Sequence, residues 1–174
     1  MTRFLVVVAV GTLMSGCVSA RVESPSAARA VLEDRNGLPV ATATFTEGSA
    51  GVRVQVTASG LRPGAKGIHI HAVGKCEPPE FTSAGAHFNP IGKKHGLKNP
   101  EGAHAGDLPN LIVSDTGSAS FDVTTKAVTL QSGSPTSLFG PDGTSVVIHA
   151  QQDDEKTYPT GNSGGRIACG VITR

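Results

Sequence analysis

The six histidines of this 174-residue chain stand at positions that suit metal binding. His69 and His71 are two residues apart, so on a β-strand both imidazoles project from the same face. The other candidate ligands follow later in the chain and are His87, His95, His104, Asp107 and His149. Imidazoles with one carboxylate suit Zn²⁺ or Cu²⁺ and suit Ca²⁺ or Mg²⁺ poorly. The sequence therefore predicts a transition-metal site.

The number of candidate ligands exceeds the need of a single ion. A lone histidine on a strand is more often a solvated or hydrogen-bonded residue than a ligand, so His69 and His71 alone would not establish a site. Six histidines and one aspartate are more than the four ligands of a tetrahedral zinc site. Two ions that share one ligand would use the surplus.

Short strands are expected to position these side chains. Glycine (22 residues) and proline (11) are frequent and aromatic residues make up only 4% of the chain, which favours tight turns and an aliphatic core. Val52, Val54 and Val56 alternate with polar residues, as in a strand with one solvated face. The expected strands cover residues 31–33, 39–46, 52–57, 67–73, 111–115, 118–124, 126–130, 145–150 and 166–173, with turn residues at 36–37, 60–64, 115–117 and 141–143. About eight such strands predict an all-β fold, an eight-stranded antiparallel Greek-key sandwich or flattened barrel.

Two segments interrupt the strand pattern and are predicted to be long functional loops. They cover residues 74–110 and 151–165, and the first contains His87, His95, His104 and Asp107. A long loop without strands needs something other than an apolar core to order it. Metal ions can supply that order.

The N-terminus predicts export from the cytoplasm. Arg3 precedes an apolar run over residues 4–14, which is too short to span a bilayer of about 30 Å as a helix and is typical of a signal peptide. Residues 14–17 (Met-Ser-Gly-Cys) resemble a bacterial lipobox, so residues 1–16 would be removed and Cys17 would carry the lipid. A cut after Ala20 is the alternative, and it would discard Cys17. A buried N-terminal strand is disfavoured because the run shows no polar alternation.

The rest of the chain divides into a tether and one domain. Residues 17–29 show no periodicity and are expected to be a flexible tether, so the domain is expected to cover 30–174. Fifteen basic and 14 acidic residues give a net charge of +1, which excludes a strongly basic nucleic-acid binder. Cys76 and Cys169 remain in the exported domain, and in an oxidising compartment such a pair is expected to form a disulfide. The expected location is the cell envelope or periplasm, with a membrane anchor if Cys17 is lipidated.

From about Ala30 to its C-terminus, the chain resembles the copper/zinc superoxide dismutases. The motifs that carry the resemblance are Gly67–His71, Ser83–Pro90, Lys94–Gly96, His104–Asn110 and Gly161–Ile172. The resemblance implies a copper ion bound by His69, His71, His87 and His149. It implies a zinc ion bound by His87, His95, His104 and Asp107, with His87 shared. It further implies that Cys76 and Cys169 form the family's disulfide, that Arg166 is its active-site arginine and that Asp153 connects the ligands of the two metals.

The activity implied by the resemblance is the dismutation of superoxide to O₂ and H₂O₂, which would protect the cell envelope. One superoxide reduces Cu²⁺ and leaves as O₂, His87 leaves copper and takes a proton, and a second superoxide reoxidises copper and leaves as H₂O₂. His87 and Arg166 would be the catalytic residues. Two other functions are alternatives to superoxide dismutation. A copper carrier of the same fold would lack a ligand or Arg166, and a structural or adhesion domain would need none of the candidate ligands.

The second loop departs from the animal members of the family. It is shorter and carries three acidic residues against one lysine, Lys156, so it does not form an obvious positive funnel for superoxide. Lys93, Lys94 and Lys98 could substitute, although ordinary solvated lysines would look the same in the sequence. A homodimer stays open, because no motif selects a dimer face.

Overall fold

The computed structural model describes residues 26–174, so the predictions about Cys17, the cleavage site and most of the tether lie outside the described residues. The described chain consists of strands with one short 3₁₀ helix, η1 (Thr82–Ala84). The strands are β1 (Ala27–Asp34), β2 (Pro39–Gly48), β3 (Gly51–Ala58), β4 (Gly64–Lys66), β5 (Ile68–His71), β6 (Leu111–Val113), β7 (Ala119–Thr125), β8 (Ser145–His149) and β9 (Arg166–Val171). Within residues 26–174 no helix is long and apolar enough to cross a membrane.

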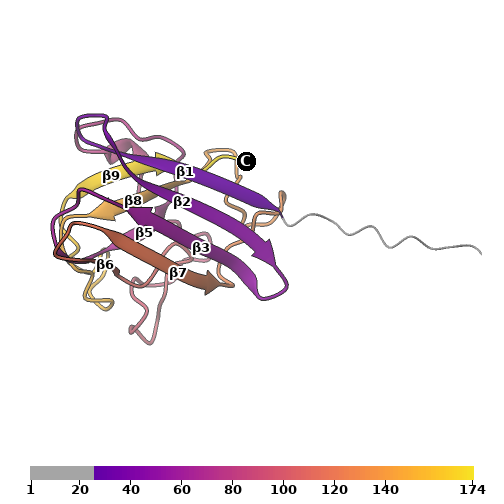
Figure 1. The fold of residues 1–174 in the computed structure, drawn as a ribbon. Helices are drawn as coiled ribbons and strands as arrows, with labels where there is room; N and C mark the ends of the chain where they lie inside the picture. The colour runs from indigo at the N-terminus through magenta and orange to yellow at the C-terminus, as the bar shows by residue number, and fades with distance from the viewer. Residues whose placement is uncertain (1–25) are drawn as a thin grey trace, which may run out of the picture.

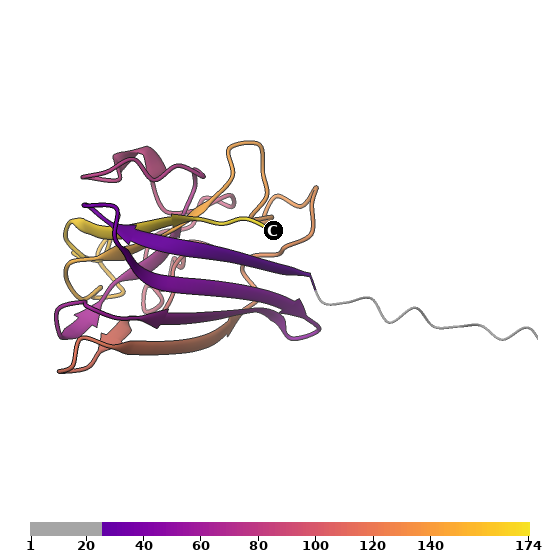
Figure 2. The ribbon, with the colours of Figure 1, turned by 45° about the horizontal axis from the view of Figure 1, so that its top comes forward.

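Seven of the strands form one antiparallel sheet that curls on itself (Figures 1 and 2). Their order is β5-β8-β9-β1-β2-β3-β7, and β4 pairs with β6 in a second, small sheet. β6 leads into β7 through a tight turn in which Gly117 N donates to Ser114 O, and β4 is separated from β5 by Gly67 alone. The small sheet therefore links the two edges of the large one, which makes a flattened barrel. The prediction of an antiparallel all-β fold is confirmed.

Alternating burial explains the long strands. In β1 the inward side chains are Ala28, Ala30 and Leu32, and in β3 they are Val52, Val54 and Val56, while their neighbours face solvent or are only partly buried. Each larger aliphatic side chain in this interior contributes about 2 kcal/mol to folding through burial.

β8 differs because it is buried on both faces. One face packs on the main core, and Val147 on the other face packs with Phe81 and Ala84 beneath the first loop. Cys169 belongs to the same small cluster. The first loop thus covers the outer face of the strand that carries His149.

Three expectations about the strands were wrong. Residues 126–130 form no strand: Thr129 makes only an isolated bridge with Ser137, and the Glu47 carboxylate accepts hydrogen bonds from the Thr129 hydroxyl and the Leu130 amide. β4 forms where the 60–64 turn was expected to end, and it is too short to show alternation. β1 begins at Ala27, so the tether ends three residues earlier than expected; its first residues are alanines, whose hydrophobic signal is weak.

The predicted disulfide between Cys76 and Cys169 is present. It connects the start of the first loop to β9, across 93 residues of sequence. The disulfide therefore ties the first loop to β9, next to the small cluster. Arg166 is the first residue of this strand.

We expect Cys76→Ser to lower the melting temperature of the metal-free protein. In the chain-entropy model a crosslink that closes a loop of this length contributes on the order of 4 kcal/mol. Thermal unfolding of the variant, compared with wild type in the presence and absence of reductant, measures the effect. The reduced wild type should unfold with the variant, and a variant that melts with the oxidised wild type would contradict this role.

Candidate metal centre

The first loop is held against β5 by backbone hydrogen bonds. Ile70 accepts the amide of Phe88 at 2.8 Å and donates its own amide to Gly106 O at 2.9 Å. These bonds place His87 beside His71 and Asp107 beside His69 as bridged pairs. A side chain at position 106 would overlap the Ile70 carbonyl oxygen, so this approach requires glycine. Two distant parts of the chain thus bring their candidate ligands together.

A first group consists of His69, His71, His87 and His149, whose ligand atoms lie within 4.8 Å of one another. Three of these rings are oriented by an outward contact of one nitrogen. His69 Nε2 lies 2.6 Å from Asp153 Oδ2, His71 Nδ1 lies 3.0 Å from Gly85 O, and His149 Nδ1 lies 3.1 Å from Gly164 O. The other nitrogen of each ring remains for the group, and the Nε2 atoms of His71 and His149 are 3.4 Å apart.

A second group consists of His87, His95, His104 and Asp107 and gathers around one carboxylate oxygen. Asp107 Oδ1 lies 2.9 Å from His87 Nδ1, 3.1 Å from His95 Nδ1 and 3.3 Å from His104 Nδ1. Asp107 Oδ2 is fixed by the backbone amides of Gly96 and His104, at 2.8 and 3.0 Å. One oxygen therefore positions the carboxylate and the other faces three imidazoles.

His87 belongs to both groups, with one nitrogen in each. Nδ1 faces Asp107, whereas Nε2 is buried and has no hydrogen-bond partner. Among the described residues only this atom and His69 Nδ1 are buried side-chain nitrogens or oxygens without a partner, and both belong to the first group. A buried polar atom left unpaired costs about 1 to 3 kcal/mol. A cation in the first group would satisfy both atoms, so the residues fit two ions that share His87.

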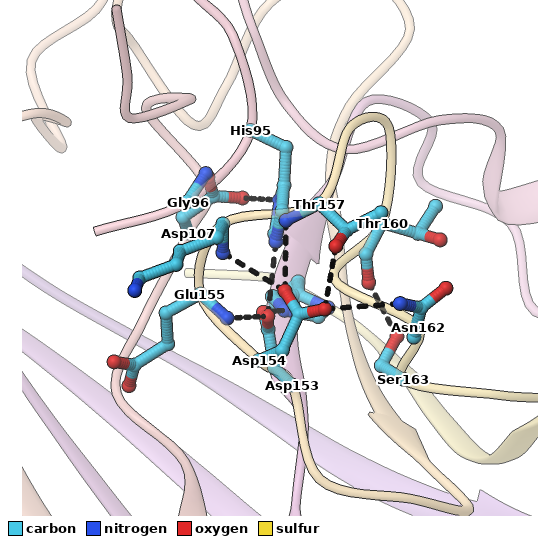
Figure 3. Close-up of polar contacts among 12 residues, drawn as sticks. His95, Gly96, Asp107, Asp153, Asp154, Glu155, Thr157, Thr160, Asn162 and Ser163 are labelled. Carbon is cyan, nitrogen blue, oxygen red and sulfur yellow. Dashed lines mark hydrogen bonds and ion pairs between the residues drawn. The ribbon is translucent and has the colours of Figure 1, made fainter. Parts of the chain in front are cut away.

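Asp153 connects the two groups, and Figure 3 shows it beside His95 of the second group. Its Oδ2 contacts His69, and its Oδ1 lies 3.0 Å from His95 Nε2. Its backbone amide donates to Asn110 Oδ1 at 2.8 Å. Gly161, in a left-handed conformation with φ of 62°, leaves room for the carboxylate, since a Cβ there would overlap Asp153 Oδ1. One carboxylate thus orients a ligand candidate of each group.

Burial and carboxylates give His95 a different charge state from His69 and His149 of the first group. Burial lowers the pKa of His69 to about 4 and that of His149 to about 3, so these imidazoles are neutral at pH 7. Burial also acts to lower the pKa of His95, but hydrogen bonds with Asp107 and Asp153 outweigh it and raise that pKa to about 9. Burial disfavours the charged form of both carboxylates, yet hydrogen bonds to the histidines hold the pKa of each well below its usual range. The neutral rings of the first group have lone pairs free to bind a metal ion. In the second group the protonated His95 supplies the positive charge that a metal ion would otherwise supply.

The two groups also differ in access. A pocket of about 580 Å³ is lined by His71, His87 and His149 of the first group, together with Arg166 and the edge of His104. His95 is fully buried, and neither it nor Asp107 lines the pocket. The first group can be reached by a small molecule, whereas the carboxylate of the second group is enclosed.

The sequence profile of copper/zinc superoxide dismutase (SODC) matches residues 40–172. The chain belongs to the copper/zinc superoxide dismutase family. It is 47% identical to superoxide dismutase [Cu-Zn] 2 of Aquifex aeolicus over 156 residues, which are 89% of this chain and 91% of that protein. It is 40% identical to superoxide dismutase [Cu-Zn] of Caulobacter vibrioides over 147 residues, which are 83% and 84% of the two chains. A superoxide dismutase-like protein from Bacillus subtilis has the same fold, with a TM-score of 0.79 at 41% identity over 82% of this chain and 96% of that one.

The structure brings together the seven candidate ligands, Asp153 and Arg166, and it pairs Cys76 with Cys169. It adds contacts that the sequence did not predict, chiefly the carbonyls of Gly85 and Gly164, which orient His71 and His149. Asn110 was also missed as a contributor, although it ends one of the family motifs. Backbone carbonyls carry no residue-type signal, so these contacts could be found only in the fold.

We expect Asp153→Asn to lower the pKa of His95 in the metal-free protein, because one of its two carboxylate partners is lost. Because the pKa of His95 is raised from 6.5 to about 9 on folding, its protonation stabilises the folded state. The contribution is complete below pH 6.5 and is lost as the pH rises towards 9. The variant should therefore lose less stability than wild type between pH 6.5 and 9. Side-chain NMR titration of His95 and thermal unfolding measure the two effects. Asp154→Asn is the matched control, and an equal His95 pKa in Asp153→Asn and wild type would contradict the assignment.

Proposed function

We propose that this chain dismutates superoxide to O₂ and H₂O₂, with copper held by His69, His71, His87 and His149 and zinc held by His87, His95, His104 and Asp107. The observation that carries the proposal is His87, whose two nitrogens face different groups and whose buried Nε2 has no partner in the described chain. An imidazole bridges two cations only when both nitrogens are deprotonated, and two dications favour that state.

Access supports the assignment of the two ions. Structural zinc sites are closed, and catalytic metal sites keep an open position. The all-histidine group lines the pocket and suits copper, whereas the enclosed group with the carboxylate suits zinc. When bound, copper supplies the one-electron couple between Cu²⁺ and Cu⁺ that two superoxide ions and two protons need to form O₂ and H₂O₂.

His87 serves proton transfer in this proposal. Its Nε2 is buried and faces the copper group, and with zinc on Nδ1 it would hold a proton when copper does not bind it. Its Nδ1 remains against Asp107 at 2.9 Å, so the ring keeps its position while Nε2 changes state.

Arg166 is proposed to dock the substrate anion. Its Nη1 and Nη2 donate to the carbonyls of Phe81 and Gly85, each at 2.6 Å. Two of five guanidinium donors are thus used to fix the side chain, and the group lies beside three copper-group histidines in the pocket. A fixed planar cation in this position suits a small anion such as superoxide.

The acidic residues of the second loop do not line the pocket at Arg166, and each is engaged elsewhere. Asp153 lies between His69 and His95, and Asp154 accepts from the backbone amides of Lys156 and Thr157 (Figure 3). Glu155 forms an ion pair with Lys98 at 2.6 Å, which also removes Lys98 from the candidate steering residues.

Lys94 remains as the best-placed lysine for steering. Its ammonium lies 4.8 Å from the centre of the Tyr158 ring, and Tyr158 lines the pocket. The contact holds a positive charge near the pocket entrance. Within residues 26–174 the Lys93 side chain forms no contact with an aromatic ring of this kind.

Export to the cell envelope also belongs to the proposal. It rests on the signal-peptide pattern of residues 4–14 and on the disulfide, a bond that persists in oxidising compartments. Cleavage before Cys17, with lipid attached there, and cleavage after Ala20 stay open. A homodimer also stays a prediction.

We expect Asp107→Ala to loosen the first loop and to abolish zinc binding, while the copper histidines other than His87 keep their contacts. The second group cross-links this loop, and the ion it would hold adds to the backbone hydrogen bonds and the buried Phe81 that also order it. Zinc content and protease sensitivity within residues 81–110 measure the effect. The exposed Asp115→Ala is the control. Zinc content and protease resistance equal to the parent in Asp107→Ala would count against the assignment.

We expect Arg166→Ala to lower kcat/KM for superoxide about tenfold or more while copper and zinc contents stay unchanged, since a charge-assisted contact to the anion is lost. Arg166→Lys should fall between, because it keeps the charge and loses the planar donors. Added salt should slow wild type more than Arg166→Ala. Superoxide decay measured with metal analysis tests this, and full activity of Arg166→Ala with both metals bound would refute the docking role.

A further inference from the structure

A second positively charged pocket lies away from the two ligand groups. It has a volume of about 480 Å³ and is bordered by the turn after β1, the segment before β4 and the residues that follow β8. Its polar lining includes Arg35, Asn36, Arg62 and Lys66, and its apolar lining includes Val40 and Ile167. None of the histidines lines it, nor does Arg166.

Lys66 is the unusual member of this pocket because it is a buried cation. Its side chain is on β4 and the residue is only 8% exposed. Nζ donates to the Ala150 carbonyl at 3.0 Å, which uses one of the three ammonium donors. Among residues 26–174 no carboxylate lies within 4.0 Å of it. Lysines are rarely buried without an anionic partner, so Lys66 lacks a counter-ion.

The other charges of the pocket do not supply that counter-ion. In the described part of the chain, Arg35 and Arg62 also have no carboxylate within 4.0 Å. Asp34 is the one acidic residue of the lining. Its Oδ1 accepts the amides of Asn36 and Leu38 at 2.8 and 2.9 Å, so this carboxylate is committed to the turn after β1.

We propose that this pocket binds a small anion that carries two or more carboxylate or phosphate groups, with Lys66 at its base. Ammonium supplies a point charge, and the guanidinium groups of Arg35 and Arg62 suit the planar oxygens of carboxylates and phosphates. The volume is within the range of small-molecule sites. The apolar side chains of Val40 and Ile167 can cover a short carbon skeleton. The site is independent of the proposed function, because it shares no lining residue with the pocket at the metal centre.

The test is a titration of the metal-loaded protein, with copper reduced to Cu⁺ and the disulfide intact, against citrate and against pyrophosphate. Binding is followed by amide NMR and by calorimetry. Saturable shifts at Asn36, Gly60 and Lys66 are expected. Lys66→Met and Arg62→Gln should each weaken binding about tenfold or more, because each removes a charged hydrogen-bond donor. Lys126→Gln, which removes an exposed charge outside the pocket, should leave binding unchanged.

Arg62→Gln keeps the test valid if Lys66→Met does not fold, because Arg62 is exposed. Arg166→Ala separates the two anion sites, since it should retain citrate or pyrophosphate binding here even if it loses superoxide activity. Binding of neither anion by wild type would overturn the proposal. Equal affinity in wild type, Lys66→Met and Arg62→Gln, or shifts confined to the pocket at Arg166, would overturn it as well.

Discussion

The backbone pairing of the first loop with β5 is the constraint on which the rest of the site depends. The two hydrogen bonds of Ile70 fix Phe88 on one side and Gly106 on the other, so the register of a short strand sets two ligand contacts at once. His71 is paired with His87, and His69 with Asp107. Because side chains alternate along a strand, a slip of one residue would turn both histidines of β5 away from their group. The distance between the two groups is therefore determined by strand geometry before any ion is bound.

Carboxylates then hold the rings at the angles that the backbone does not determine. Asp107 and Asp153 both contact His95, and Asp153 also reaches His69 from the second loop. Two buried carboxylates close to one imidazole would repel each other strongly, and the raised pKa of His95 shows how the metal-free protein relieves that repulsion. Of the three acidic residues of the second loop, Asp153 serves this internal purpose, whereas Asp154 accepts backbone amides and Glu155 pairs with Lys98. The charge composition of the loop consequently gives little information about the potential that an incoming anion meets.

Features of the structure that leave a pattern of residue types in the sequence were predicted, and features that depend on contacts between distant residues were not. Strands with one solvated face, such as β3, were predicted because burial alternates, and the ligand residues were predicted because imidazole at motif spacing is rarely accidental. The segment 126–130 was assigned wrongly because it is held by one isolated bridge, between Thr129 and Ser137, and by the side chain of Glu47, and neither contact can be predicted from its own residues. The ring orientations of His71 and His149 depend on main-chain carbonyls, which every residue type shares. The burial of Lys66 could not be predicted either, because a lysine in a short strand is normally expected to face solvent.

The difference between the two ligand groups finally explains why one fold can hold two ions for different purposes. The enclosed group pairs three imidazoles with a carboxylate that backbone amides fix in place, so it favours a cation of constant charge and constant geometry. The group at the pocket has no carboxylate ligand, and burial keeps the rings of His69, His71 and His149 neutral, so its donors tolerate a change of one unit of charge on the ion they hold. Under the proposed function His87 would couple the two groups, because Nε2 could change its state while Nδ1 stays beside Asp107. The difference in burial around one shared ring would then separate a structural ion from a reactive one.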